Sequence, residues 1–409
     1  MSFESGLSGL AAASQDLDVI GNNVANSGTV GFKQSQIQFS DVYANSLSGA
    51  GASQIGIGTK VADVAQQFTQ GNITATSNPL DVAINGGGFF RMDNNGSVSF
   101  TRNGQFQLNN TGYIVDANGD KLTGYTANSN GALSTGAPAD LNINTASLPP
   151  KLTSTVNALL NLNAASTVPA NSFNINDPTS YNNATSVSVY DSLGNSHSLQ
   201  TFYVTNGNGS WNVYATSDGV PIGYTPPNPP VAIGTLNFST SGTVTSGSPM
   251  AVSMPVGTGA ATPLNISLNY AGTTQYGAQF SVNSLQQNGY TSGQLSNFSI
   301  GSDGKINGSY TNGQTATLGQ VVLANFTDPN GLQSMGNNQW AATAASGPPL
   351  IGAPGSASLG VLQSSATESS NVDLTTELVN MITAQRNYQA NAQTIKTEDA
   401  LTQTLINLR

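Results

Sequence analysis

The residues best suited to catalysis are few in this sequence and lie far apart. His197 is the single histidine, Ser196 and Ser198 flank it, and Asp191 is the nearest acid. Ser-His-Asp catalysis needs three converging groups and an oxyanion hole, and no Gly-x-Ser-x-Gly turn framed by a strand and a helix accompanies them. We therefore expect a surface or hairpin histidine rather than a catalytic one.

Two short motifs imitate binding loops. The stretch Asp116–Asp120 begins like a calcium loop, but Lys121 stands where the loop needs glycine and Ala127 where it needs a bidentate glutamate. Gly86–Gly88 lacks the Gly-Lys-Ser/Thr of a phosphate loop, so a tight β turn is favoured. One histidine and no cysteine exclude two-histidine metal sites, cysteine-type zinc sites and thiolate catalysis. We predict no catalytic, cofactor or metal site.

Charge is scarce in this chain of 409 residues, a length that suggests two to four domains. Only 7% of residues are charged, against about 25% in an average soluble protein. The 10 basic residues cannot form the stripe that nucleic acid or anionic membranes bind. No apolar run is long enough to span a bilayer as a helix, so membrane insertion is not expected. The first basic residue is Lys33, which does not fit a secretory signal, so any export is expected to use another route.

Turn signals divide the chain into a β-rich middle and two helical ends. All 18 prolines lie between Pro79 and Pro354, and the Asn-Gly dipeptides that favour hairpins lie within the same span. The predicted fold class is therefore α+β, with several domains.

The N-terminal end carries a heptad stripe of apolar residues, with Ser14 and Gly21 at the intervening positions. The stripe consists of Phe3, Leu7, Leu10, Leu17 and Val24. Gly28 and Gly31 supply a stop signal. Three glycines inside the predicted helix each cost about 1 kcal/mol relative to alanine, so this helix should be marginal alone.

The C-terminal end carries a longer stripe, preceded by Ser370-x-x-Asp373, which resembles a capping box. An unbroken helix is predicted from Val372 to Leu408, with this stripe: Leu374, Leu378, Met381, Gln385, Tyr388, Ala392 and Ile395, then Leu401, Leu405 and Leu408 after a one-residue phase shift. The shorter N-terminal stripe cannot cover it all, so we expect part of it to bury against another chain. Packing of both helices on the chain's own β-rich middle is the alternative.

A nested order of domains is predicted from the charge distribution. The 153 residues between Lys151 and Lys305 contain no lysine or arginine, which indicates an inserted domain. We predict a discontinuous helical coiled-coil assembly domain with an extended linker, and two mainly antiparallel β domains. The boundaries are 1–70 with 365–409 for the helical domain, 71–147 with 285–364 for the inner β domain, and 148–284 for the outer insertion.

Long paired motifs at both ends resemble one family, the bacterial flagellar rod and hook axial proteins. Asn22–Lys33 (NNVANSGTVGFK) resembles its N-terminal signature, and Asn371–Arg409 is similar to its C-terminal signature. The match extends inward through NPLDVAINGGGFFRM, TRNGQF, LTGY and GQVVLANFTDPNGL. The signature positions are Asn22, Asn23, Asn26, Gly31, Phe32, Lys33, Gln385, Arg386, Asn387 and Tyr388. The Ser/Gly-rich stretch Ala44–Gly58 is longer than this resemblance leads us to expect.

The resemblance implies a structural protein rather than an enzyme. Rod members are shorter and lack so large an insertion, so the length favours the hook members. For these the resemblance implies a helical homopolymer, a tube lined by the terminal helices, that works as a flexible universal joint transmitting torque from rod to filament.

The resemblance also implies partners and a location. The partners are other copies of the chain, the distal rod, the hook cap, the hook–filament junction protein and the flagellar export apparatus. The location is the extracellular flagellum, reached by type III export without a cleaved signal peptide. The alternatives are a distal rod or junction protein and, from a different class, a secreted β-rich adhesin or a glycan-binding enzyme.

Overall fold

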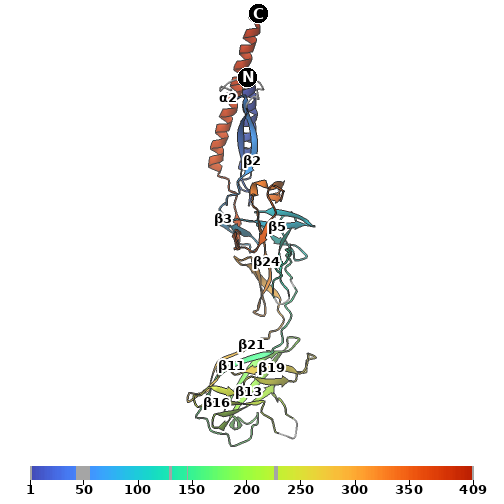
Figure 1. The fold of residues 1–409 in the computed structure, drawn as a ribbon. Helices are drawn as coiled ribbons and strands as arrows, with labels where there is room; N and C mark the ends of the chain where they lie inside the picture. Colours follow the sequence, from blue (N-terminus) through green and yellow to red (C-terminus); the bar gives the residue numbers. More distant parts are fainter. Residues whose placement is uncertain (1, 43–55, 129–130, 145, 225–228, 408–409) are drawn as a thin grey trace. The chain divides into compact units, whose positions relative to one another are not determined.

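A computed structural model describes residues 2–42, 56–128, 131–144, 146–224 and 229–407. Within it the chain folds as two compact units (Figure 1). The first comprises Met1–Thr145, Asn297–Ser309 and Thr315–Arg409, and the second comprises Ala146–Ser296 and Tyr310–Gln314. Most of the Ser/Gly-rich stretch Ala44–Gly58 lies outside the described residues.

Two helices and a β-hairpin form the terminal part of the first unit. Helix α1 spans Ser2–Ala25 and helix α2 spans Leu374–Asn407. Strands β1 (Ser35–Val42) and β2 (Gly58–Gln66) pair antiparallel, and both contact α1, which also contacts α2. Both predicted helices are therefore present, and the segment expected to be an extended linker is largely this hairpin.

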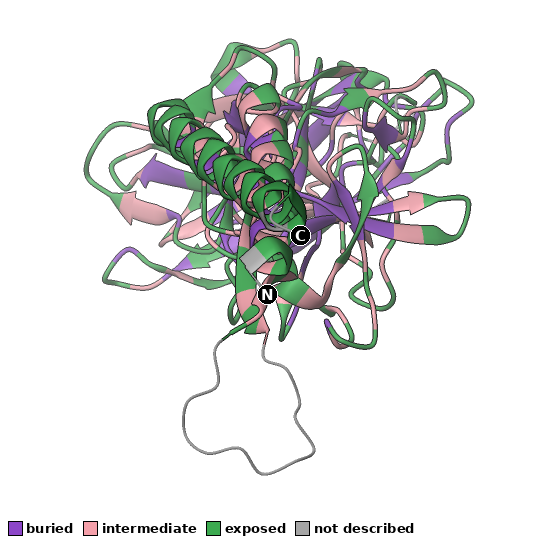
Figure 2. Ribbon diagram, turned by 90° about the horizontal axis from the view of Figure 1, so that it is seen from above, coloured by how far each residue is buried: buried purple, intermediate pink, exposed green. Residues whose placement is uncertain are grey.

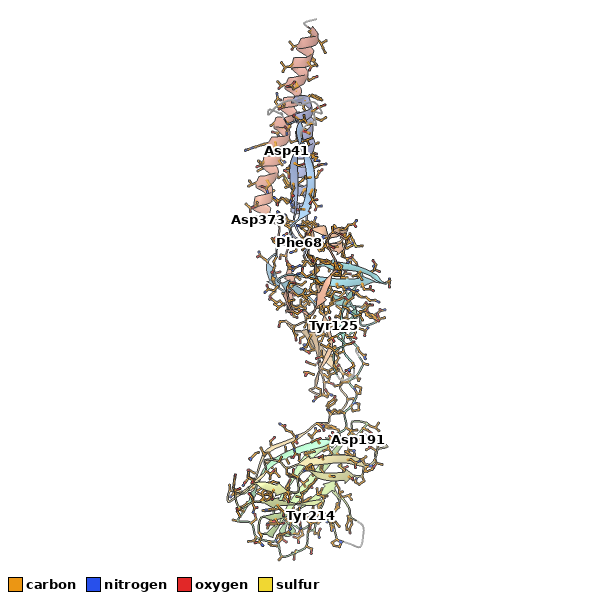
Figure 3. All side chains as sticks on the ribbon, in the orientation of Figure 1. Asp41, Phe68, Tyr125, Asp191, Tyr214 and Asp373 are labelled. Atoms are coloured by element: carbon orange, nitrogen blue, oxygen red, sulfur yellow. The ribbon has the colours of Figure 1, made fainter. Side chains whose placement is uncertain are left out.

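Helix α2 begins one turn later than the predicted capping box implies. Asp373, labelled at the start of the helix in Figure 3, is itself the N-cap. Its carboxylate accepts from the backbone N–H of Thr375 at 2.8 Å and of Thr376 at 3.3 Å. The Ser370 hydroxyl instead accepts from the N–H of Val372 at 3.2 Å, in the turn before the helix. Placing the cap at Ser370 was wrong because both residues favour caps and only the backbone geometry distinguishes them.

The rest of the first unit is β structure. Its main sheet has the order β22-β23-β24-β9-β5-β6-β27-β26. The strands are β3 (Ile73–Ala75), β4 (Val82–Asn85), β5 (Phe89–Asn94), β6 (Ser97–Thr101), β7 (Gln107–Leu108), β8 (Ile114–Val115), β9 (Lys121–Thr126), β10 (Ala139–Asp140), β22 (Leu295–Ile300), β23 (Lys305–Tyr310), β24 (Thr315–Val321), β25 (Leu323–Asn325), β26 (Gln333–Gly336), β27 (Gln339–Ala341), β28 (Leu350–Gly352), β29 (Val361–Ser364) and β30 (Ala366–Glu368), with a 3-10 turn at Pro329–Gly331. Phe89, Phe100, Phe326 and Trp340 form an aromatic core with edge-on contacts.

The second unit consists of two sheets that share one core. One sheet has the order β18-β19-β11-β20 with β21 beside β11, and the other has the order β12-β13-β14-β16-β17 with β15 beside β14. The strands are β11 (Thr155–Asn163), β12 (Asn183–Tyr190), β13 (Ser196–Gly207), β14 (Ser210–Ser217), β15 (Val220–Pro221), β16 (Gly234–Phe238), β17 (Val244–Ser246), β18 (Met250–Met254), β19 (Leu264–Asn269), β20 (Thr274–Tyr276) and β21 (Ser281–Gln287), with a 3-10 turn at Pro178–Ser180. Leu160, Tyr203, Trp211 and Tyr270 are fully buried between them.

The α+β multidomain prediction is confirmed at this level. Most strand pairs are antiparallel, although β11 runs parallel to both β19 and β20. The predicted boundary at residue 284 was wrong because it falls inside β21, whose pairing with β11 no single-sequence signal revealed. The two connecting segments instead pair at Leu148 and Gly293, which places the ends of the insertion side by side.

Candidate assembly surface

Helix α1 approaches α2 closely at two glycines, and other positions of α1 are buried within the first unit. Gly6, Ala12, Ala13 and Ile20 of α1 are buried. A Cβ atom added at Gly9 would lie 2.8 Å from the Asn391 side chain, and one added at Gly6 would lie 3.2 Å from Cγ1 of Ile395. The glycines that lower the intrinsic helix propensity therefore allow the two helices to approach closely.

The predicted apolar stripes lie mostly outside this contact. Phe3, Leu7, Leu374, Leu378 and Leu401 are each 47–53% exposed. Leu10, Leu17, Val24, Met381 and Ile395 are half-buried, and Tyr388 is exposed. The Leu405 side chain and all of Leu408 lie outside the described part of the chain.

The contact face of α2 is thus rotated from the predicted one. Its buried and half-buried positions are Glu377, Met381, Ala384, Asn391, Ala392, Ile395 and Glu398, which share only Met381, Ala392 and Ile395 with the predicted stripe. The self-assembly role predicted for the stripe stays a prediction, because a heptad spacing does not say which neighbour covers it. Figure 2 shows α2 exposed over most of its surface.

An apolar face of α2 consequently faces solvent in the single chain. Leu374, Leu378 and Ile382 follow one another at a spacing of four, which places them along one side of the helix, and all are about half exposed. Full burial of such a side chain contributes about 1.5–3 kcal/mol, so covering the exposed half of these three would contribute roughly 2–4 kcal/mol.

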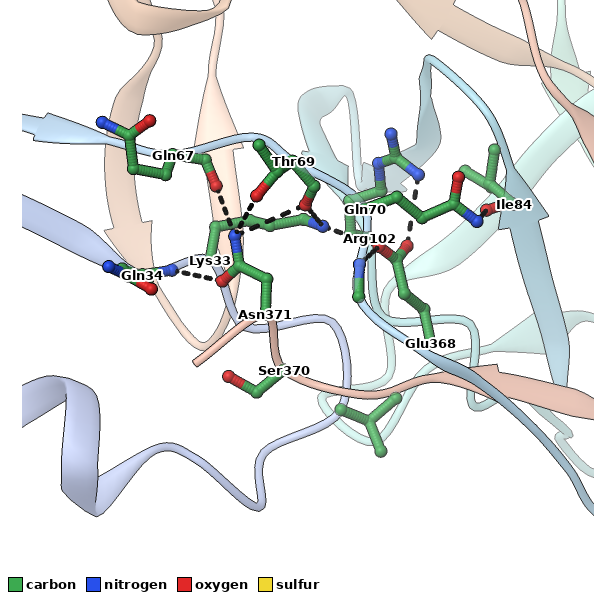
Figure 4. Close-up of polar contacts among 12 residues, drawn as sticks. Lys33, Gln34, Gln67, Thr69, Gln70, Ile84, Arg102, Glu368, Ser370 and Asn371 are labelled. Carbon is green, nitrogen blue, oxygen red and sulfur yellow. Dashed lines mark hydrogen bonds and ion pairs between the residues drawn. The ribbon is translucent and has the colours of Figure 1, made fainter. Parts of the chain in front are cut away.

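A buried ion cluster holds the terminal segments on the β part of the first unit (Figure 4). Nζ of Lys33 lies 2.6 Å from Oε1 of Glu368, and Nη1 of Arg102 lies 3.2 Å from Oε2 of the same carboxylate. All three side chains are at most 4% exposed. Burial lowers the pKa of Lys33 and of Arg102, and the nearby carboxylate of Glu368 opposes that shift. The cluster joins the segment after α1 to strand β30, which precedes α2.

Two asparagines fix the chain next to this cluster. The Asn23 side chain donates to the carbonyl of Ser35 at 2.8 Å and accepts from its N–H at 2.9 Å. The Asn371 side chain accepts from the N–H of Gln34 at 2.8 Å and donates to the carbonyl of Gln67 at 2.7 Å (Figure 4). These bonds set the course of the chain between α1 and β1, and hold β1, β2 and the start of α2 together.

The N-terminal signature residues have structural contacts. Nδ2 of Asn26 donates to the carbonyl of Asn22 at 3.0 Å, which closes the end of α1. Gly31 has φ +73° and donates to the carbonyl of Glu368 at 2.8 Å, and an added Cβ would lie 2.6 Å from the backbone nitrogen of Asn103. Only glycine fits this position. Phe32 is half-buried beside Lys33.

The C-terminal signature residues behave differently. Gln385, Arg386, Asn387 and Tyr388 are all exposed on α2. Sequence reasoning missed Glu368, Arg102 and Asn371 as positioning residues. The signal for Arg102 and Glu368 was the scarcity of charge, since they belong to a set of only 30 charged side chains, yet the sequence does not show which of these meet. The signal for Asn371 was its place at the start of the C-terminal signature.

His197 lies in the β12–β13 hairpin, as one of the two expectations had it, but it is buried rather than on the surface. Its Nδ1 lies 2.7 Å from Asp218 and its Nε2 lies 3.3 Å from Asp191, so neither ring nitrogen is free to activate a serine. Burial lowers the pKa of His197, but hydrogen bonds and charge from the two aspartates outweigh this and raise it. Burial likewise opposes the shift at Asp191, whose pKa is nevertheless held low by hydrogen bonds from Thr258, Asn195 and His197.

The carboxylates of Asp116 and Asp120 are hydrogen-bonded to another side chain of the protein. Nε2 of Gln339 donates to Asp116 at 2.9 Å and to Asp120 at 2.6 Å. No group of three or more metal-binding side chains is found among the described residues. In the same part of the chain, neither helix is long and apolar enough to cross a membrane.

Family models match four segments of the chain. They are "Flagella basal body rod protein" at residues 3–33, "Flagellar hook protein FlgE/F/G D1 domain" at 83–191, "Flagellar basal body protein FlaE D2 domain" at 161–290 and "Flagellar basal body rod FlgEFG protein C-terminal" at 363–408. The first and last of these contain the two terminal helices.

Relatives match over the whole length. The flagellar hook protein FlgE of Salmonella typhimurium is 44% identical over 416 residues, and that of Escherichia coli is 43% identical over 420 residues, with all of each chain covered. The flagellar hook protein FlgE of Brucella suis is 31% identical, covering all of this chain and 98% of that one.

A solved structure has the same fold over much of the chain. The crystal structure of the Helicobacter pylori flagellar hook protein FlgE2 gives a TM-score of 0.55 at 14% identity, and the match covers 72% of this chain and all of that one.

Proposed function

The chain belongs to the flagellar hook protein FlgE family, and we propose that it assembles with copies of itself into a helical tube that transmits torque as a flexible joint. It is a structural subunit of the bacterial flagellar hook. We propose further that the terminal helices line the tube and that the tube bends.

The observation that carries the proposal is the uncovered apolar surface of the terminal helices. Leu374, Leu378 and Ile382 form one exposed face on α2, and Phe3 and Leu7 are exposed on α1. The contact between the two helices uses other positions, so these side chains remain available to a neighbouring copy. We propose that the assembly residues are Phe3, Leu7, Leu10, Leu17, Val24, Leu374, Leu378, Met381, Tyr388, Ile395, Leu401, Leu405 and Leu408.

The nested order supports separate roles for the parts. We propose that the helices and hairpin, residues 1–70 and 365–409, form the inner assembly domain. The insertion then interrupts the inner β domain in the sequence. The insertion leaves and returns at adjacent points, Leu148 and Gly293, so its removal should leave the remainder folded. Its scarcity of charge favours contacts that exchange partners with water at small net cost.

Family membership also supports the proposed partners and route. We propose contacts with the distal rod, the hook cap and the hook–filament junction protein at the tube ends. Export through the flagellar type III apparatus, without a cleaved signal peptide, belongs to the same proposal.

Truncation tests the assembly role. A chain lacking Leu374–Arg409 should remain monomeric in sedimentation while keeping the β-sheet circular dichroism of both units, because each unit has its own core. A matched variant in which a short Gly/Ser linker replaces residues 149–292 should still form tubes, with altered curvature in electron micrographs. Tubes formed by the truncated chain, or their loss in the linker variant, would contradict the proposed division of roles.

A further inference from the structure

A polar cavity lies where α1, α2 and β1 meet. Its volume is about 250 Å³, and its lining includes Asp16 and Asn23 of α1, Ser35 of β1, and Glu377 and Asn387 of α2. The charged side chains of this lining are both acids, Asp16 and Glu377. The part of β1 that lines the cavity carries no charge.

The Glu377 carboxylate is buried there without a full set of partners. The residue is 3% exposed, and its Oε2 has no hydrogen-bond partner among the described residues. Burial raises the pKa of Glu377, Asp16 and Asp373 add to the shift through their charge, and a hydrogen bond with Asn23 opposes it. Burial also raises the pKa of Asp16. A buried carboxylate oxygen of this kind is costly unless a cation or donor meets it.

No ion pair among the described residues involves Glu377 or Asp16. Lys33 and Arg102 are bound to Glu368, Lys121 to Asp140, and Lys305 to Asp303. Helix α1 carries no basic residue at all.

The exposed basic residue nearest to Glu377 in sequence is Arg386, and it does not face the cavity acid. Arg386 follows Glu377 by nine residues, and at about 100° per residue it lies on the opposite side of α2. It is exposed and has no ion pair among the described residues. Its guanidinium matches a carboxylate in shape and donors better than the ammonium of Lys396 does.

We infer that the cavity is a receptor for a cationic side chain of a second copy of the chain, and that Arg386 of that copy fills it. The inference rests on the proposed self-assembly, which brings the outward side of one α2 against the α1–α2 face of a neighbour. Arg386 and Glu377 lie on opposite sides of α2 in one subunit, so each subunit both donates and receives. Such a contact is head-to-tail and propagates, as a helical polymer requires.

Formation of this contact should make assembly depend on pH. In the free subunit the cavity acids hold protons up to a higher pH than ordinary carboxyls, and pairing with a guanidinium favours their ionised form. Assembly therefore releases protons. The critical concentration for polymerisation should rise as the pH falls through the raised carboxyl range, with Asp16 and Glu377 responsible and Asp373 acting through its charge.

A double-mutant cycle tests the contact. The variants are Glu377→Gln, Arg386→Gln and the double variant, with Asp18→Asn and Lys396→Gln as charge-matched controls at exposed positions of the same helices. Each tested single variant should raise the critical concentration, measured by sedimentation at pH 7, at least tenfold. The double variant should be no worse than the worse single variant, because both remove the same contact. The control variants should change the critical concentration less than threefold. Glu377→Gln should flatten the dependence of the critical concentration on pH.

Two results would overturn the inference while leaving assembly intact. One is additive effects of the two substitutions, and the other is a Glu377→Gln chain that polymerises as well as the unaltered one. A failure of the unaltered and control chains to polymerise would instead refute the proposed assembly and the inference with it.

Discussion

Replacing Glu368 by glutamine should destabilise the first unit more than any other single charge removal near the helices. The carboxylate accepts from Lys33, Arg102 and the N–H of Gly71, and it is fully buried. Glutamine keeps the shape but leaves two buried cations with no counter-charge. Breaking a buried ion pair in this way costs about 3–5 kcal/mol.

Removal of Lys33 should destabilise the first unit less than removal of the Glu368 charge. In Lys33→Met the carboxylate keeps Arg102 and Gly71 as partners, and the bond from Lys33 to the carbonyl of Thr69 is lost. We expect a cost of about 1–3 kcal/mol, close to that of one unsatisfied buried group. A matched surface control is Asp303→Asn, which breaks the half-exposed pair with Lys305 and should cost under about 1 kcal/mol.

The two tryptophans allow the first unit to be followed alone. Trp340 belongs to the aromatic core of the first unit and Trp211 to the core of the second, so guanidinium unfolding is measured in a Trp211→Phe background. The expected order of unfolding free energies is Asp303→Asn above Lys33→Met above Glu368→Gln. A Glu368→Gln chain within 1 kcal/mol of the background would refute the view that this cluster anchors the terminal segments.

Three further predictions concern the helix cap, the helix contact and the buried histidine. Asp373→Ala removes the acceptor for two N–H groups at the start of α2, so it should cost about 1 kcal/mol and speed amide hydrogen exchange in the first turn, whereas unchanged exchange would contradict the cap. Gly9→Val should separate the helices, because its Cβ would meet Asn391, and helical circular dichroism should melt at a lower temperature than in the control Gly28→Ala, where an added Cβ meets nothing. The raised pKa of His197 means that its contribution to the second unit is complete below about pH 6.5 and is lost as the pH rises through the folded value. Trp211 fluorescence melts from pH 6 to 9 in a Trp340→Phe background should show that loss with His197 present and not in His197→Gln.

The β turns were predictable because their cause is local. Asn-Gly at Asn95 and Asn208 and Asp-Gly at Asp218 predict hairpins, and all three dipeptides have positive φ at both residues between paired strands. The existence of both terminal helices followed in the same way from periodicity. Family membership followed from long motifs at both ends.

The packing of the helices was not predictable, because it depends on residues distant in sequence. Gly9 is a local cost for α1, and only its closeness to Asn391 shows why it is there. Lys33 and Glu368 are 335 positions apart, and their pairing depends on how the segment after α1 meets strand β30. Nothing in the sequence around His197 shows that Asp218, 21 positions later, lies beside its ring.

If copies assemble on the exposed apolar face of α2, a charge on that face should block assembly. The most direct test of this expectation is the sedimentation of Leu378→Asp beside Leu193→Asp, since both leucines are about half exposed and only Leu378 lies on that face. A charge in a buried contact must be desolvated, so Leu378→Asp should stay in the supernatant at concentrations where Leu193→Asp and the unaltered chain form tubes. Tubes from Leu378→Asp at the same critical concentration as the control would contradict the account.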